Sequence, residues 1–108
     1  MMTANKYQVL ASRTVNLEKS DMEIHALHGM ASELGEIHSI YQHTFQGEQL
    51  NKLHVQKELG DLLWFIAEYC TSQEWSLESI MQMNIDKLQK RYPNGFEAKK
   101  SIERKEEL

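Results

Sequence analysis

Four carboxylates in this chain occur as two pairs with the same spacing. Glu33 and Glu36 are three residues apart, and so are Glu58 and Asp61. Residues three apart in a helix lie on one side of it, on successive turns. Mg²⁺ takes oxygen ligands such as carboxylates and keeps waters that substrate phosphates can replace. The two pairs therefore predict one Mg²⁺ site, with Mn²⁺ as a possible substitute, and chemistry on a phosphate group.

The position of each pair around its helix supports a bound cation. At roughly 100° per residue, Glu33 and Glu58 fall inside apolar arcs, whereas Glu36 and Asp61 fall at the edges. An ionised carboxylate buried without a partner costs several kcal/mol, and neither arc contains a lysine or an arginine. The alternative is that all four are ordinary solvated acids on wide helices. The arcs consist of Ala26, Leu27, Met30, Leu34, Ile37, Ile40 and Tyr41, and of Val55, Leu59, Leu62, Leu63, Phe65, Ile66 and Tyr69.

A di-iron carboxylate site is a rival interpretation of paired acids on helices. Such sites use Glu-x-x-His on two of the helices. The pairs here are Glu-x-x-Glu and Glu-x-x-Asp, with no histidine at that offset. An all-oxygen ligand set favours Mg²⁺ or Mn²⁺ over iron or zinc.

The elements that position the carboxylates are expected to be helices. One proline and five glycines in 108 residues are too few for many tight turns. Apolar periodicity predicts helices at about 5–15, 20–41, 51–72 and 76–91, with Ser20 and Glu23 forming a capping box, and Asn51 and Ser76 as further N-caps. Short connections predict an all-α, antiparallel bundle of about four helices. Within the helices, Gly35 and Gly60 indicate either the close approach of another helix or of substrate beside the metal, or tolerated strain.

The remaining composition suggests a single cytoplasmic domain. Residues 1–96 are expected to form that domain, and 97–108 a charged tail that frays or forms a solvated helix. The net charge of −4 gives no basic surface for nucleic acid. Cys70 is expected to be a small core residue. The N-terminus does not resemble a signal peptide, and the longest apolar run, 62–67, is too short to cross a membrane.

Three motifs in this order resemble the MazG-like, all-α nucleoside triphosphate pyrophosphohydrolases. They are E-L-G-E at 33–36, K-E-L-G-D-L-L-W at 57–64 and N-I-D-K-L-Q-K-R-Y-P-N-G-F at 84–96. The resemblance covers about residues 7–96. It implies hydrolysis of a (d)NTP to the monophosphate and pyrophosphate, for control of nucleotide pools or removal of aberrant nucleotides. It also implies a homodimer or homotetramer, which the wide apolar arcs favour independently.

The resemblance also assigns roles to individual residues. Glu33, Glu36, Glu58 and Asp61 would hold Mg²⁺, and Glu36 or Glu33 would orient or deprotonate the attacking water. Asn84 matches an asparagine of the family near the metal and phosphates. Lys87 and Arg91, one turn apart, would face phosphate, and Tyr92 would continue that substrate-binding surface.

Two features leave the substrate open. Ser32 and Leu34 are bulkier than the small residues that the family often has around its first pair, which weakens any transfer of substrate preference. The same motifs also suit a related pyrophosphohydrolase acting on dUTP or phosphoribosyl-ATP.

A helical interaction protein that keeps the scaffold without catalysis is the alternative from another functional class.

Overall fold

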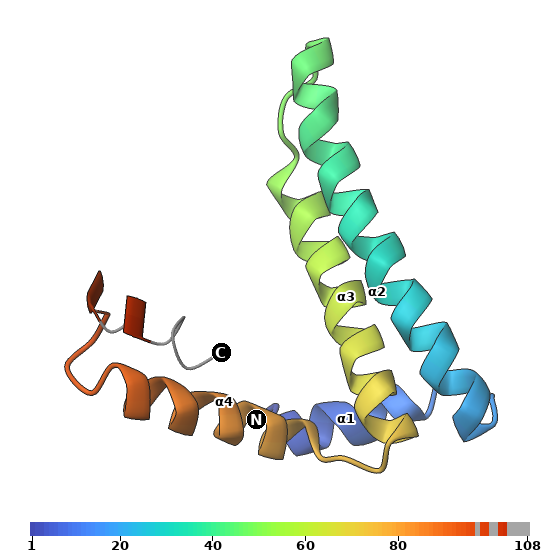
Figure 1. The fold of residues 1–108 in the computed structure, drawn as a ribbon. Helices are drawn as coiled ribbons and strands as arrows, with labels where there is room; N and C mark the ends of the chain where they lie inside the picture. The colour runs from blue at the N-terminus through green and yellow to red at the C-terminus, as the bar shows by residue number, and fades with distance from the viewer. Residues whose placement is uncertain (97, 100–101, 104–108) are drawn as a thin grey trace. The chain divides into compact units, whose positions relative to one another are not determined.

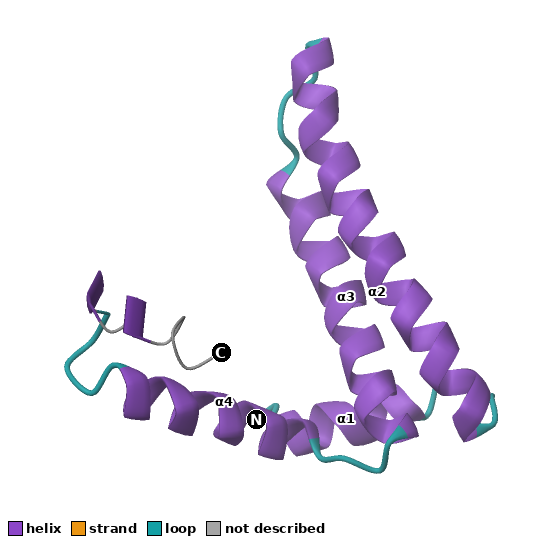
Figure 2. Ribbon diagram, in the orientation of Figure 1, coloured by secondary structure: helices purple, strands orange, loops and turns teal. Residues whose placement is uncertain are grey.

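A computed structural model describes residues 1–96, 98–99 and 102–103. The described residues contain helices and no strand (Figure 2), so the all-α prediction is confirmed. The chain divides into two compact units, Met1–Leu77 and Glu78–Leu108. The helices are α1 (Ala4–Ser12), α2 (Lys19–Gln42), the 3₁₀ helix η1 (His43–Gln46), α3 (Lys52–Ser72) and α4 (Leu77–Arg91).

The first unit is built on an antiparallel hairpin of α2 and α3, with α1 packed against α3 (Figure 1). Gly47, at φ 95°, ends η1 in the left-handed conformation that favours glycine. Asn51 caps α3 as predicted, since its side chain accepts a hydrogen bond of 3.1 Å from the His54 backbone N–H. The predicted Ser20 capping box was wrong. The helix begins at Lys19 after Glu18, with no side-chain cap, so Ser20 already lies in the first turn.

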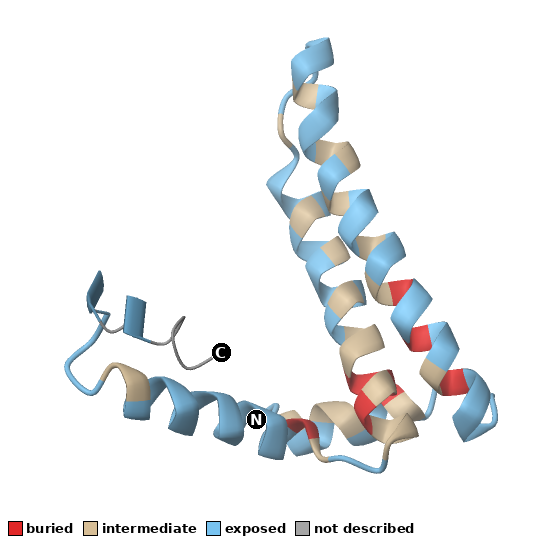
Figure 3. Cartoon of the chain, viewed as in Figure 1, coloured by how far each residue is buried: buried red, intermediate tan, exposed pale blue. Residues whose placement is uncertain are grey.

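A small core joins α1, α3 and the first residue of α4. It consists of Ala11, Ala67, Cys70 and Leu77, with partly buried aromatic and aliphatic neighbours, and it contributes to the buried segments in Figure 3. Trp64 is one of these neighbours, and its indole N–H donates to Thr14 Oγ1, just after α1, at 2.9 Å.

Gln8 ties the N-terminal helix to the segment that follows α3. Its side-chain amide donates to the Trp75 carbonyl at 2.8 Å and its oxygen accepts from the Leu77 N–H at 2.8 Å. The second bond satisfies one of the backbone N–H groups that a helix leaves without an intrahelical partner at its start. Helix α4 therefore begins directly after Ser76, as the sequence predicted.

The close approach of α2 and α3 occurs at Gly29. A Cβ at this position would lie 2.2 Å from the Phe65 ring, so no larger residue fits without a shift. A Cβ at Gly35 or Gly60 would meet nothing within 4 Å. Close approach within the chain therefore does not explain those two glycines; Gly29, which periodicity did not single out, has that role.

Only part of each predicted apolar arc is buried within the chain. Leu27, Leu34 and Tyr41 on α2 are 46–49% exposed, and Leu59 and Leu63 on α3 are 50% and 42% exposed. The hairpin thus uses a narrower interface than the sequence offers. None of the described helices combines the length and hydropathy needed to cross a membrane.

The second unit contains the rest of α4 and the turn after it. The helix ends at Arg91, and the following Pro93–Gly95 turn is closed by a 3.1 Å bond from the Gly95 N–H to the Tyr92 carbonyl. The predicted end of this helix at about residue 91 is confirmed. Most of the predicted tail, 97–108, lies outside the described residues.

Candidate metal centre

One seam between α2 and α3 positions the candidate site. His25 faces Glu68, Gly29 faces Phe65, and Glu33 faces the Glu58–Asp61 pair. Each step of about one turn towards the C-terminus of α2 is matched by a similar step towards the N-terminus of α3. This antiparallel register brings together two motifs that are far apart in sequence.

Three of the four predicted ligands meet in the middle of the seam. Glu33, Glu58 and Asp61 each offer a carboxylate oxygen, and these atoms all lie within 4.8 Å of one another. Glu33 and Glu58 are half-buried and Asp61 is exposed, as their positions in and beside the apolar arcs predicted. Three convergent oxygens with one open side suit a hard cation that also keeps waters or phosphate oxygens.

The electrostatics of the cluster show that it lacks positive charge. Glu33 Oε2 is buried without a hydrogen-bond partner. The pKa of Glu33 is raised to about 7, first by a hydrogen bond with Glu58, then by burial and by repulsion from Glu58, Asp61 and Glu36. Among the described residues, no lysine or arginine forms an ion pair with the three clustered carboxylates. A divalent cation would supply the missing charge and a partner for the orphaned oxygen, so the residues fit such an ion.

Two further side chains interact with the carboxylates of the cluster. His54 Nε2 lies 3.2 Å from Glu58 Oε1, one turn earlier on α3. Burial and the charge of Asp61 raise the pKa of the Tyr7 hydroxyl, so α1 also brings a polar group into the field of the cluster. His54 therefore borders the cluster from α3, and the Tyr7 hydroxyl on α1 lies within reach of its charge.

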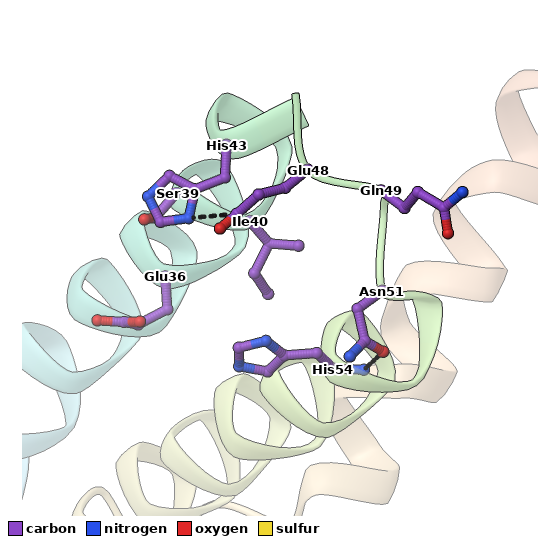
Figure 4. Close-up of a pocket in the computed structure, with 8 residues that line it drawn as sticks. All are labelled: Glu36, Ser39, Ile40, His43, Glu48, Gln49, Asn51 and His54. Atoms are coloured by element: carbon purple, nitrogen blue, oxygen red, sulfur yellow. Dashed lines mark hydrogen bonds and ion pairs between the residues drawn. The ribbon is translucent and has the colours of Figure 1, made fainter. Parts of the chain in front are cut away.

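Glu36 occupies a different position from the other three predicted ligands. It is exposed and offers no oxygen to the 4.8 Å group, although its charge helps to raise the pKa of Glu33. Its side chain instead lines an adjoining pocket towards η1 (Figure 4). Metal binding by Glu36 remains a prediction.

The predicted substrate-binding residues lie on the second unit. Asn84 and Lys87 line a shallow pocket of about 250 Å³ along α4, with Ile80 and Met83. Arg91 is one turn after Lys87, and the Tyr92 ring lies 5.3 Å from the ring of Phe96. The four residues therefore gather along α4 and its C-terminal end, and their contact with substrate remains a prediction.

Comparison with known proteins gives the family. The family model of the MazG nucleotide pyrophosphohydrolase domain matches residues 23–96, more than half of the chain. The chain belongs to the MazG nucleotide pyrophosphohydrolase family. This match includes both carboxylate pairs and all of α4, whereas α1 lies outside it.

A relative among curated proteins is the Gene 37 protein of Mycobacterium phage L5. It is 31% identical over 72 residues, which cover 62% of this chain and 63% of the phage protein. The chain thus spans less than two thirds of that relative. No solved structure matches.

The seam of this MazG domain contains a buried acid that the sequence analysis missed. Glu68 is 2% exposed, and both of its carboxylate oxygens lie 2.9 Å from His25 Nδ1. The His25 ring is half-exposed and contacts the ring of Phe65 at 5.5 Å. A sequence signal for Glu68 existed: it follows Asp61 by seven residues, or two helical turns, and so points the same way. The half-exposed His25 is the hydrogen-bonding partner of this acid.

Proposed function

We propose that this chain is a Mg²⁺-dependent nucleoside triphosphate pyrophosphohydrolase, with Mn²⁺ as a possible substitute. The reaction converts a (d)NTP and water into the (d)NMP and pyrophosphate. The water oxygen forms a bond to the α-phosphorus, and the bond from that phosphorus to the α–β bridging oxygen breaks. The biological role would be control of nucleotide pools or removal of aberrant nucleotides in the cytoplasm.

The orphaned Glu33 oxygen is the observation that carries this proposal. A cluster whose purpose was structural would be expected to pair its buried acid with a basic side chain or a donor. Glu33 Oε2 has neither, and two further carboxylates converge on this residue. This arrangement costs stability in the absence of a cation, which favours a functional reason for it.

The ion would be held by Glu33, Glu58 and Asp61, with Glu36 as a further ligand. When bound, it would neutralise phosphate charge and the charge that develops on the leaving pyrophosphate. Glu33 or Glu36 would orient the attacking water and accept its proton.

Helix α4 would supply contacts to the phosphates. Lys87 and Arg91 are separated by one helical turn and so project on the same side of α4, from which both can contact one triphosphate. Asn84 and Tyr92 would add neutral hydrogen bonds beside them. These contacts act on the ground state and transition state alike, so their loss should raise KM more than it lowers kcat.

The proposed assembly is a homodimer or a homotetramer. Large apolar side chains remain exposed along both α2 and α3, including Leu27, Leu34, Leu59 and Leu63. A second copy that covers them would add the core that a chain of this size lacks.

The test is pyrophosphate release from each common NTP and dNTP, from dUTP and from phosphoribosyl-ATP, with and without Mg²⁺. Glu58→Gln removes one ligand charge with little change of shape, and Asp21→Asn, an exposed position on α2, is the matched control. We expect metal-dependent release from the native chain and the control, and at least a hundredfold loss in Glu58→Gln. Folded protein that releases no pyrophosphate from any nucleotide would contradict the proposal and favour an interaction protein.

A further inference from the structure

A pocket of about 360 Å³ adjoins the carboxylate cluster at the η1 end of the hairpin (Figure 4). It is lined by the last turns of α2, the loop after η1 and the first turn of α3. His54 belongs to both features, because its ring lines the pocket while its Nε2 lies 3.2 Å from Glu58. A molecule bound at the cluster could therefore extend directly into this pocket.

The chemistry of the pocket wall excludes a second phosphate site. No lysine or arginine lines it, and it carries two carboxylates, Glu36 and Glu48. A phosphate group would be repelled here, whereas a neutral polar group would not.

The remaining lining suits a flat heterocycle with a sugar. Ile40 provides an apolar wall between the histidines (Figure 4), and the imidazoles of His43 and His54 offer planar surfaces for stacking. Asn51 and Gln49 add amides, although the Asn51 oxygen is already used to cap α3. The volume lies within the range usual for small-ligand pockets, roughly 300–1,000 Å³.

We infer that this pocket binds the nucleoside end of the substrate, and that it prefers bases with an exocyclic amino group. The inference rests on the proposed function, which places the triphosphate at the carboxylate cluster. Carboxylates accept hydrogen bonds and donate none at neutral pH, so they recognise amino groups such as that of cytosine. Glu48 is held for this role by His43, whose Nδ1 lies 3.0 Å from Glu48 Oε2.

The direct test compares kcat and KM for dCTP, dATP, dGTP, dTTP and dUTP in the native chain, His43→Ala and Glu48→Gln. The control is Glu18→Gln, an exposed position before the first residue of α2. We expect at least a tenfold higher kcat/KM for the amino-bearing bases in the native chain and the control. Both pocket variants should raise KM three- to tenfold for those substrates and reduce the preference, with kcat changed less than twofold.

Cleavage of inorganic tripolyphosphate, which has no nucleoside, separates this inference from the proposed function. The pocket variants should cleave it as the native chain does. Nucleotide cleavage that shows no base preference, prefers thymine or uracil, or is unaffected by both variants would overturn the pocket assignment and leave the metal site standing.

A binding measurement covers the case in which a variant fails to fold or no nucleotide is cleaved. Ring signals of His43 and His54 in the native chain are followed by NMR during titration with the nucleosides deoxycytidine or thymidine, without metal. Larger shifts and tighter binding with deoxycytidine support the assignment, even if cleavage fails. Unchanged signals for both histidines would overturn it.

Discussion

At the residue scale, Glu33 is the residue of the site at which repulsion and burial most strongly disfavour a negative charge. Its carboxylate faces Glu58 and Asp61, and one of its oxygens is buried without a partner. The cost applies to the ionised form, because repulsion and burial both disfavour charge. The stability of the folded chain should therefore depend, through Glu33, on both pH and bound metal, and melting temperature reports both effects.

The first prediction concerns the pH dependence of the metal-free protein. The pKa of Glu33 is raised from 4.5 to about 7 in the folded state. Between these values the folded chain binds more protons than the unfolded chain, so stability is full below pH 4.5 and is lost as pH rises through 7. In EDTA, the contribution of Glu33 should lower the melting temperature by a few degrees between pH 5 and pH 7.5.

Glu33→Gln isolates this contribution. The variant should melt a few degrees higher than the native chain at pH 7.5 in EDTA, because it removes one charge from the cluster. Saturating Mg²⁺ should raise the melting temperature of the native chain much more than that of the variant. A native chain that is more stable than Glu33→Gln at pH 7.5 without metal would contradict the assigned repulsion.

The second prediction concerns the buried Glu68. His25→Ala removes the side chain that contacts both of its oxygens, together with the ring contact to Phe65. A buried acceptor left without a partner costs about 1–3 kcal/mol, so chemical denaturation should show a loss of that size. His28→Ala, at an exposed position on the same helix, should change the free energy of unfolding by less than about 0.5 kcal/mol. Equal effects of the two variants would show that the pair adds no stability.

The positions of individual site residues were predictable where residue type and helical spacing were enough to determine them. The two carboxylate pairs, and which member of each lies deeper, followed from helical geometry. Glu68 was missed because a single acid in an apolar run gives no indication of its partner, and His25 lies forty-three residues away in the sequence. The departure of Glu36 from the 4.8 Å group depends on side-chain conformation, which spacing does not determine.

At the scale of the elements, the α2–α3 hairpin is the frame on which the site depends. Its register is fixed where the Phe65 ring packs against Gly29. The three clustered carboxylates lie about one turn further along the seam. A change in helix separation at Gly29 should therefore affect both stability and the metal site.

The third prediction follows from this packing. Gly29→Ala introduces a Cβ 2.2 Å from the Phe65 ring. Overpacking of this kind costs about 1–3 kcal/mol, more than the helix propensity that alanine gains. Denaturant titration of the metal-free protein should show a net loss of stability, and Mg²⁺ affinity should fall with it.

Gly35→Ala is the matched control for Gly29→Ala. It lies on the same helix with nothing within 4 Å of its would-be Cβ, and it should gain about 0.5–1 kcal/mol. A neutral or stabilising Gly29→Ala would show that α2 and α3 do not pack as closely as described.

The helices themselves were largely predictable, whereas their ends depended on particular contacts. Apolar periodicity located all four helices, and Asn51 capped α3 as expected. The start of α2 was predicted one residue too late, because the helix begins after Glu18 without a side-chain hydrogen bond that caps it. The link from Gln8 to Leu77 spans sixty-nine residues, and no local pattern contains it.

At the scale of the whole molecule, the described chain buries little. Its core consists of six small or medium hydrophobic residues, and no large side chain is fully buried among the described residues. Several leucines on α2 and α3 remain nearly half-exposed. Exposed apolar surface of this extent is typical of an interface, which agrees with the proposed homo-oligomer.

The fourth prediction tests that assembly by light scattering after size exclusion. The native chain, 12.7 kDa, should elute at two or four times its monomer mass. The double variant Leu27→Glu/Leu63→Glu places charges on the exposed apolar face and should shift the mass towards the monomer. His28→Glu/Gln56→Glu adds the same charges at exposed polar positions of the same helices and should leave the mass unchanged. A native mass of 12.7 kDa would contradict the assembly.

The central claim is that Glu33, Glu58 and Asp61 hold a divalent cation, and metal binding tests it most directly. Mn²⁺ binding is followed by electron paramagnetic resonance, with Mg²⁺ competition, in the native chain, Glu58→Gln and the control Asp21→Asn. The account predicts saturable binding that Mg²⁺ displaces in the native chain and the control, weakened at least tenfold in Glu58→Gln. Equal Mn²⁺ affinity in all three proteins, or none in the folded native chain, would contradict it.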